Sequence, residues 1–499
     1  MKAWKRREFL AASSGGISLG TLLGGLGSLS ASDVQLGTGI ARFSGDIEPL
    51  VQLLENTPRE KVIEEVALRV QSGLNYRQLL AALLLAGVRN VEPRPSVGFK
   101  FHAVLVVNSA HLASLASGDS ERWLPIFWAI DNFKSSQARD VREGNWTMSP
   151  VDEAAVPSSD KASSQLREAL DRWDVSAADV AITSMVRHFG ANRVFEELAA
   201  YATRDFRSIG HKVIYLSNAF RTLQTIGWDY AEPVMRSLVY AMLNHTGDPN
   251  PSKSDLEDDR PGRFNRDRAS EIPDTWLQGK HDEIATRDLI RTLHQCTPDE
   301  ASAAVVDQLQ SGVSLQSIWD AVFCSAGELL MRQRGIISLH SVTTTNAIYH
   351  AFTQASDDQT RRYLLLQNAS FLPMFREAAR GRGNLAGTHI DELEPGDQPE
   401  EVPEIFETMG GDRPAGARMA YRFLSEGGEP QSIVDQARRL VFLKGNDSHD
   451  YKFSSAALED YRVLSPEWRN RFIAASTFQL RSSKEPTLSL VKRIQSAIS

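Results

Sequence analysis

Ser314-Leu-Gln-Ser-Ile-Trp-Asp-Ala-Val-Phe-Cys-Ser-Ala-Gly-Glu-Leu-Leu330 carries apolar residues at intervals of three and four. This spacing places them on one face of an α-helix. The same spacing recurs at 47–54, 62–70, 76–86, 166–173, 194–202, 233–243 and 301–309. Runs that alternate in the manner of a strand are few, and the β-branched stretch 104–107 lies within a helical pattern. The sequence therefore predicts an all-α, multi-helical array with few or no strands.

Residues that commonly begin helices stand in front of several of these segments. Asn75 precedes one segment and Ser176 precedes another, and both residue types cap helix N-termini. Thr297-Pro298-Asp299-Glu300 combines a capping residue, a proline for the first turn and two acids that favour the helix dipole. We expect helices to begin directly after Asn75, Ser176 and Thr297.

Three segments rich in Pro, Gly, Asp and Ser interrupt the pattern, at 136–164, 247–282 and 381–417. Their composition predicts long surface loops or linkers. Such segments are either functional, lid-like loops or disordered linkers, and the residues leave both alternatives open.

The N-terminus reads Lys5-Arg6-Arg7-Glu8-Phe9-Leu10, the pattern of a twin-arginine export signal. A weakly apolar stretch at 11–29 and small residues near position 31 follow it. We expect 1–31 to be a signal peptide, the twin-arginine translocase to be a partner during export, and the mature protein to be periplasmic or secreted. The alternative is a basic N-terminal helix. Because this pathway accepts folded cargo, export also favours a cofactor acquired before translocation.

Composition excludes several classes of function. The 55 basic and 63 acidic residues are intermixed and give a net charge of −8, which argues against a nucleic-acid partner. No later apolar run approaches ~20 residues, so we expect no integral membrane segment in the mature chain. Cys296 and Cys324 are the only cysteines, which excludes a cysteine-based metal cluster and leaves a single bridge open.

Three related segments recur along the chain. They are Phe101-His102-Ala-Val-Leu-Val-Val-Asn108, Gly210-His211-Lys-Val-Ile-Tyr-Leu-Ser-Asn218 and Leu339-His340-Ser-Val-Thr-Thr-Thr-Asn346. In each, a histidine opens an apolar helix and an asparagine follows six or seven positions later. The recurrence predicts internal quasi-repeats. We assign helical units to 32–140, 165–246 and 283–380, followed by a C-terminal helical segment at 418–499.

Equivalent helices in a quasi-symmetric fold face one another, so His102, His211 and His340 are the main candidates for a shared site. Imidazoles that converge from several helices are a common way to hold a transition metal. The competing interpretation is that each histidine anchors its own helix start. His111 and His350 follow nine or ten residues later and point to other faces, so we interpret both as structural.

The segment Asp447-Ser-His449-Asp450-Tyr-Lys452 supplies a fourth candidate. His449 lies about as far beyond His340 as His211 lies beyond His102. It is a candidate metal ligand or acid–base group, with Asp447 or Asp450 orienting its ring and Lys452 nearby. The alternative is a solvated turn at a helix start. We assign catalytic roles to His102, His211, His340, His449 and Asp450, and metal binding to the four histidines.

Polar and aromatic residues on apolar helices complete the set of candidates. Asn108, Asn218 and Asn346 are candidate cofactor or substrate contacts, although buried amides more often tie helices together. Trp123, Trp128 and Trp228 offer flat walls to an aromatic ligand, but tryptophans are more often core residues. His188 is a weaker candidate on an apolar helix, and the histidines in or beside loops (His245, His281, His294 and His389) carry no signal.

Several common motifs are absent from the sequence. It contains no Gly-x-Gly-x-x-Gly between a strand and a helix, no Walker A sequence, no His-Glu-x-x-His and, outside the expected signal peptide, no Gly-x-Ser-x-Gly elbow. Conventional flavin or nicotinamide domains, P-loop enzymes, serine hydrolases and thermolysin-type proteases are therefore disfavoured.

The segments around His102, His211 and His340 resemble the questin oxidase-like family, through short motifs scattered over residues 60–380. That family consists of helical proteins with dispersed histidines and a His-x-Val-Thr segment. Its namesakes carry out Baeyer–Villiger-type oxygenation of anthraquinones without a recognisable flavin motif. The resemblance implies that these three histidines are site residues. Two features depart from the family. Its namesakes use cytoplasmic NADPH, which an exported protein would not meet. In addition, neither the export signal nor the His449 segment belongs to the family pattern.

Together, these features predict an exported oxidoreductase of monooxygenase type. It would act on an aromatic or other organic substrate in a histidine-lined pocket, with a histidine-bound transition metal as its cofactor. The alternative is a non-enzymatic extracytoplasmic helical scaffold or ligand-binding protein whose histidines are structural.

Overall fold

The structure, a computed structural model, describes residues 39–94, 99–243 and 249–498. Helices make up 71% of it, and the described residues contain no β-strand. Their one isolated extended pairing is a bridge between Lys280 and Val313. The prediction of an all-α, multi-helical array is confirmed.

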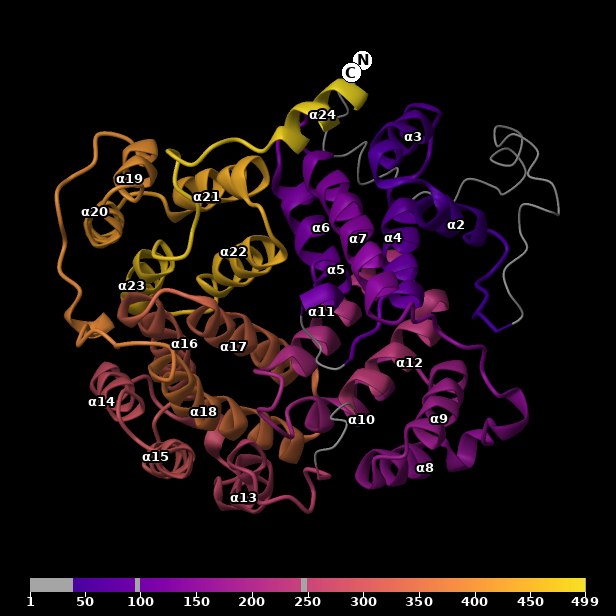
Figure 1. The fold of residues 1–499 in the computed structure, drawn as a ribbon. Helices are drawn as coiled ribbons and strands as arrows, with labels where there is room; N and C mark the ends of the chain where they lie inside the picture. The colour runs from indigo at the N-terminus through magenta and orange to yellow at the C-terminus, as the bar shows by residue number, and fades with distance from the viewer. Residues whose placement is uncertain (1–38, 95–98, 244–248, 499) are drawn as a thin grey trace.

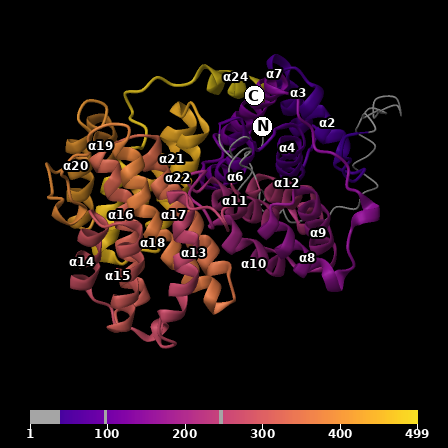
Figure 2. The same cartoon turned by 60° about the horizontal axis from the view of Figure 1, so that its bottom comes forward.

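The N-terminal half of the chain lies on one side of the molecule in both views (Figures 1 and 2). Its helices are α2 (Glu48–Asn56), α3 (Arg59–Gln71), α4 (Tyr76–Asn90), α5 (His102–Leu105), α6 (Val107–Ala116), α7 (Leu124–Glu143), α8 (Ser159–Arg172), α9 (Val175–His188), α10 (Ala191–Ala202), α11 (His211–Ile226) and α12 (Ala231–Met242).

The C-terminal half lies opposite, except that its last helix returns to pack on α3 and α7. Its helices are α13 (Arg260–Arg268), α14 (Glu283–Leu293), α15 (Pro298–Gln310), α16 (Leu315–Arg332), α17 (Ile336–Gln354), α18 (Asp358–Arg380), α19 (Val402–Thr408), α20 (Arg413–Ser425), α21 (Pro430–Lys444), α22 (Ser448–Asp460), α23 (Pro466–Ser476) and α24 (Ser489–Ile498).

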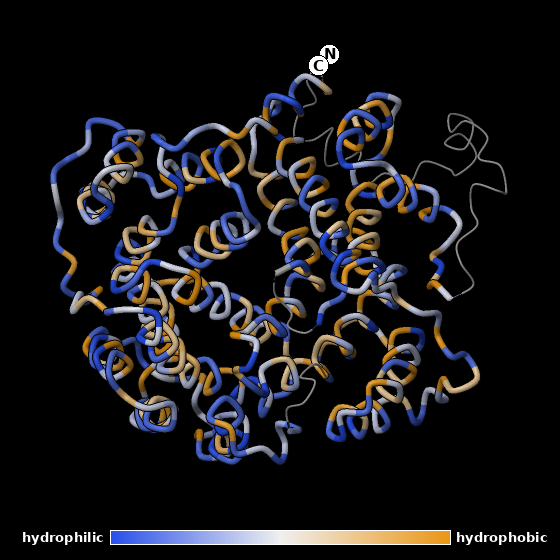
Figure 3. Tube along the Cα trace, viewed as in Figure 1, coloured by the Kyte–Doolittle hydropathy of each residue, from blue (hydrophilic) through white to orange (hydrophobic). Residues whose placement is uncertain are grey.

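Short 3₁₀ turns connect some of these helices. They are η2 (Phe99–Phe101), η3 (Glu153–Ala155), η4 (Trp228–Tyr230), η5 (Glu257–Asp259), η6 (Ala269–Glu271), η7 (Trp276–Gln278) and η8 (Ile390–Glu392). Most helices carry both hydrophobic and hydrophilic residues (Figure 3). Their buried apolar side chains form one continuous core that reaches from Ala41 to Ile494. Burial of this core is the main force that holds the array together.

Two of the three predicted helix starts are confirmed. The Asn75 side chain accepts a hydrogen bond from the Arg77 amide, and Thr297 forms a reciprocal capping box with Glu300. Each such cap stabilises its helix by about 1 kcal/mol. The prediction at Ser176 is wrong: Asp174 caps α9, and Ser176 lies in the first turn.

The three segments expected to be loops contain helix. In 136–164, α7 continues to Glu143 and α8 begins at Ser159. The other two segments contain α13 and α19, and the last also contains the start of α20. In these three helices a proline occupies one of the first two positions, where it needs no hydrogen-bonded N–H. Proline, counted as a mark of a loop, here marks helix starts.

Three further predictions concern the N-terminal signal peptide, membrane-spanning helices and a disulfide bond. The signal peptide expected at 1–31 lies outside the described residues. None of the described helices is both long and apolar enough to cross a bilayer. Cys296 and Cys324 are buried and unbridged, so the disulfide left open above is not formed. Burial raises the pKa of the Cys296 thiol to about 11.

Candidate metal centre

Four helices bring one histidine each to the centre of the molecule. His102 begins α5, His211 begins α11, His340 lies in the second turn of α17, and His449 lies at the start of α22. Helix α5 packs on α11, α11 on α17, α17 on α22, and α22 again on α5. These helices therefore form a closed ring, which brings together histidines more than 100 residues apart.

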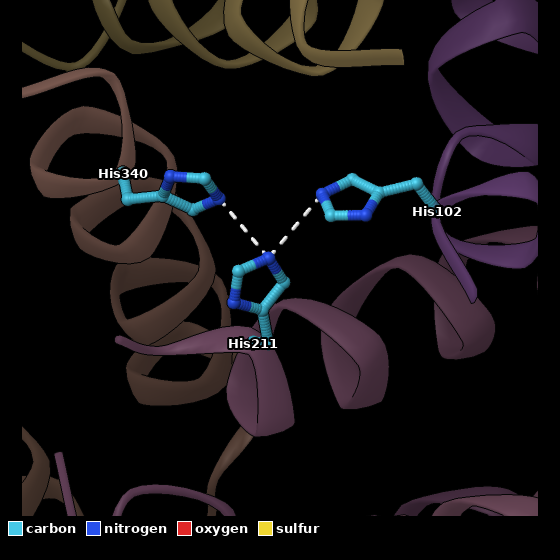
Figure 4. A group of neighbouring side chains, drawn as sticks. All are labelled: His102, His211 and His340. Atoms are coloured by element: carbon cyan, nitrogen blue, oxygen red, sulfur yellow. Dashed lines mark hydrogen bonds between the residues drawn. The ribbon is translucent and has the colours of Figure 1, made fainter. Parts of the chain in front are cut away.

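Three of the four histidines meet nitrogen to nitrogen. Nε2 of His211 lies 3.3 Å from Nε2 of His102 and 3.0 Å from Nε2 of His340 (Figure 4). All three side chains are buried, with residue exposures of 4%, 4% and 1% for His102, His211 and His340. One ligand atom from each lies within 4.8 Å of those of the other two. We call this group the three-histidine cluster.

The second ring nitrogen of two histidines fixes their tautomers. Nδ1 of His211 lies 2.7 Å from the carbonyl oxygen of Ser208, and Nδ1 of His340 lies 2.7 Å from that of Ile336. Because a carbonyl oxygen only accepts, each Nδ1 carries the hydrogen and donates it. In the neutral rings, both Nε2 atoms therefore present bare lone pairs to each other across 3.0 Å.

Protonation does not relieve this repulsion at neutral pH. Burial, with smaller contributions from Lys452 and the neighbouring imidazoles, holds the pKa of His102, His211 and His340 well below the ordinary value. A metal cation between the lone pairs would remove the conflict. Two ligands about 2.05 Å from a tetrahedral ion stand about 3.3 Å apart, so the observed spacings of 3.0 and 3.3 Å fit such an ion.

A strained turn places His211. Ile209 has a φ of +42° and Gly210 a φ of +80°, and positive φ is rare for a β-branched residue such as isoleucine. A Cβ on Gly210 would overlap the side chain of Thr344 on α17. The Thr344 hydroxyl donates to the carbonyl oxygen of Ile209. The turn therefore brings the start of α11 close to α17, and such strain often accompanies functional sites.

His449 stands beside the cluster rather than within it. Its ring centroid lies 4.4 Å from that of His102 and 5.2 Å from that of His340. Asp447 orients the ring, because its carboxylate lies 3.2 Å from Nδ1 of His449. Burial lowers the pKa of His449, and Asp447 partly opposes this shift.

An open cavity of ≈ 320 Å³ adjoins the cluster. Its lining includes His449, Asp447, Arg481 and Ile336, whose carbonyl oxygen holds the His340 ring. His449, with 24% of its side chain exposed, therefore contacts both the cavity and the buried histidines.

Asp450 contributes to the start of α22. It completes a capping box with Asp447, accepts a hydrogen bond from the Asn446 amide and forms an ion pair with Arg481. Burial raises the pKa of Asp450, while Arg481 opposes the shift. Its carboxylate thus supports the helix that carries His449, and Asp447 is the acid that orients the imidazole.

Lys452 is the other ionisable group near the cluster. The residue is buried, with an exposure of 2%, and its Nζ has no hydrogen-bond partner among the described residues. Burial lowers the pKa of Lys452 to about 7, so the amine is partly neutral at physiological pH. Its charge in turn lowers the pKa of all four histidines.

Two of the three asparagines predicted to contact a substrate, Asn218 and Asn346, lie on the same helices as His211 and His340. Asn108 is buried on α6. Asn218 donates to the carbonyl oxygen of Leu105, and Asn346 donates to Asp460 and Glu459. Asn218 and Asn346 thus tie helices together, which is the usual role of buried amides.

His111 and His350 lie apart from the cluster. Nδ1 of His111 lies 2.8 Å from the Tyr76 hydroxyl, and His350 packs edge-on against Phe195. These contacts agree with the structural roles expected from the sequence.

Acid should destabilise the fold through His111. Burial lowers its pKa from 6.5 to about 4, so below pH 6.5 the unfolded chain binds a proton that the folded chain does not. Stability is therefore lost as the pH falls from 6.5 towards 4. Between pH 7 and pH 4.5, His111 should account for a loss of about 2 kcal/mol. Urea unfolding should show His111→Gln losing about 2 kcal/mol less than wild type over this interval; equal losses would contradict the prediction.

The remaining histidines that the structure describes lie in several different environments. His188 is exposed in the last turn of α9, and its Nδ1 bonds to the Ser184 carbonyl oxygen. His281 contacts Ser317, and His245 lies outside the described residues. His294 and His389, which carried no signal in the sequence, stack on each other beside Glu328.

The tryptophans considered as walls for an aromatic ligand contact other rings of the protein. Trp123 packs on Tyr76, and Trp228 packs on Phe220. Trp128 stacks on Tyr451 with ring centroids 4.2 Å apart. These contacts favour the core interpretation of all three residues.

Comparison with known proteins identifies no relative: no family model, no curated protein and no solved structure matches this chain.

Proposed function

We propose that this chain is a metalloenzyme in which His102, His211 and His340 bind one transition metal ion through their Nε2 atoms. The observation that carries the proposal is the pair of Nε2 distances, 3.3 and 3.0 Å, that join His211 to the other two rings. The Nδ1 hydrogen bonds to Ser208 and Ile336 support it, because they leave Nε2 free as a ligand and orient the rings.

Three neutral ligands leave a coordination position open, which is typical of catalytic rather than structural metal sites. His449 and the adjoining cavity suit that open side. In the proposed enzyme, His449 exchanges protons between the cavity and the reacting group, and Asp447 holds its Nδ1 hydrogen. His449 is thus proposed as an acid–base residue beside the metal, not as one of its ligands.

Lys452 completes the proposed site. Its buried amine has no carboxylate at hydrogen-bond distance among the described residues, so it is available to donate to an oxygen anion of the substrate. A pKa of about 7 lets the amine gain or lose a proton near neutral pH.

We further propose oxidoreductase activity of monooxygenase type on an aromatic or other organic substrate. The resemblance at His102, His211 and His340 supports this class of reaction. When bound, a redox-active metal supplies the means to activate dioxygen. One oxygen atom enters the substrate and the other leaves as water, with two electrons and two protons from an organic two-electron reductant. In an exported enzyme this reductant differs from NADPH.

Elemental analysis of protein purified from the periplasm or medium after native export tests the proposal. We expect iron, copper or manganese at the cluster, and oxygen uptake that depends on the metal, a reductant and an aromatic substrate. A protein retained in the cytoplasm would refute the export expected from the N-terminal sequence. Zinc at the cluster would refute the proposed redox reaction, but the proposed metal centre would stand. A metal-free wild type that takes up no added ion would refute both, in favour of the ligand-binding scaffold.

A further inference from the structure

A second group of side chains that could hold a metal ion lies at α14, α16 and the residue before η8. His294 is the C-cap residue of α14, Glu328 lies in α16, and His389 directly precedes η8. One ligand atom from each lies within 4.8 Å of those of the other two. None of these residues belongs to the three-histidine cluster, so the proposed function does not use them.

Glu328 is held in place as a ligand would be. Its side chain is buried, with a residue exposure of 3%. Oε2 accepts a hydrogen bond from the Ile390 amide at 2.9 Å, while Oε1 lies 2.6 Å from Nδ1 of His294. One oxygen therefore fixes the carboxylate, and the other is directed at the imidazole pair.

The two imidazoles are arranged for a shared ligand rather than for a simple ion pair. The rings of His294 and His389 stack with centroids 4.0 Å apart and planes 21° from parallel. Nδ1 of His389 is buried and has no hydrogen-bond partner among the described residues. Leaving such a group unsatisfied costs about 1–3 kcal/mol. An ion pair between His294 and Glu328 would not need His389, whereas a bound cation would satisfy its nitrogen.

Within the part of the chain that the structure describes, Arg332 is the one arginine or lysine that pairs with this carboxylate. Its Nη1 lies 3.9 Å from Oε1 of Glu328, too far for a hydrogen bond. The same guanidinium group donates to the carbonyl oxygens of Ala386 and His294. Arg332 therefore holds the backbone around the site and leaves Oε1 to the histidines.

We propose that His294, Glu328 and His389 form a second binding site for a divalent transition metal. Two imidazoles and one carboxylate suit Zn²⁺ or Fe²⁺, and three protein ligands leave a position for water or a small ligand. His389 also lines an open groove of ≈ 300 Å³ with Thr388, Glu392 and Arg418, from which an ion can reach the site.

The site also joins segments far apart in the chain. His389 lies in the segment between α18 and α19, and metal ligation would fasten this segment to α14 and α16. Ser341, the residue after His340, lines the small cavity beside His294 and Glu328. The two proposed metal sites therefore lie near different faces of α17, and their ions must be assigned separately.

Calorimetric titration of metal-stripped protein with ZnCl₂ tests the second site. We expect two ions per chain in wild type and one ion in Glu328→Gln and in His389→Ala. The glutamine keeps an oxygen for the Ile390 amide, so the fold should survive the loss of the ligand. His389→Ala removes a half-buried side chain and serves as the second variant. His188→Ala, at an exposed histidine, should keep both ions.

The outcomes separate the two sites. His211→Ala should keep the ion at His294, Glu328 and His389 and lose the other. If Glu328→Gln and His389→Ala bind as many ions as wild type, the second site is refuted and the group is a structural ion pair with a stacked ring. If wild type binds one ion that only His211→Ala loses, the second site fails while the three-histidine centre stands.

Discussion

The His211→Ala variant is expected to lose the metal ion of the three-histidine cluster completely. His211 is the central ligand, since its Nε2 lies within 3.3 Å of both other Nε2 atoms. Loss of an outer-shell partner typically weakens metal binding 10–100-fold, and loss of a direct ligand should exceed this. Elemental analysis should show one ion fewer per chain than in wild type.

Loss of the metal ion should also remove the gain in the free energy of unfolding that metal binding provides. At a free metal concentration about 1,000 times the dissociation constant, binding stabilises the folded chain by about 4 kcal/mol. We expect this gain in urea unfolding of the Glu328→Gln protein and its absence after His211→Ala is added. Adding His188→Ala instead should leave the gain unchanged. Equal stabilisation with and without His211 would show that the cluster does not bind the ion.

The Gly210→Ala variant should be destabilised by about 2–4 kcal/mol. Alanine is unfavourable at a φ of +80°, and its Cβ would also overlap Thr344 on α17. Because Gly210 directly precedes His211, the same substitution should displace that ligand and weaken metal binding.

Gly312→Ala is the matched control for this variant. Gly312 has a φ of +83°, and a Cβ there would meet nothing within 4 Å. It should therefore lose only about 1 kcal/mol, the cost of the left-handed conformation. If both variants lose the same amount in urea unfolding, the approach of the α11 turn to α17 is not what makes Gly210 necessary.

The site was only partly predictable. The recurrence of a histidine before a helical asparagine identified His102, His211 and His340, and the structure brings their nitrogens together. The regular spacing along the chain also drew attention to His449, whose ring lies beside the cluster. The choice between Asp447 and Asp450 as its orienting acid required coordinates, because both lie within one turn of the imidazole in sequence.

Local patterns were sufficient for the helices because a helix depends on contacts three and four residues apart. The spacing in 314–330 and the Thr297 capping box are information of this kind. The proline that opens α13 is too, although the composition of 247–282 predicts a loop there. The convergence of side chains depends on crossing angles between helices distant in the chain. His294, Glu328 and His389 lie on three segments distant in the chain, and the strained turn at Ile209 and Gly210 lies against Thr344 of α17. No neighbour in sequence encodes these contacts, since long-range packing creates them.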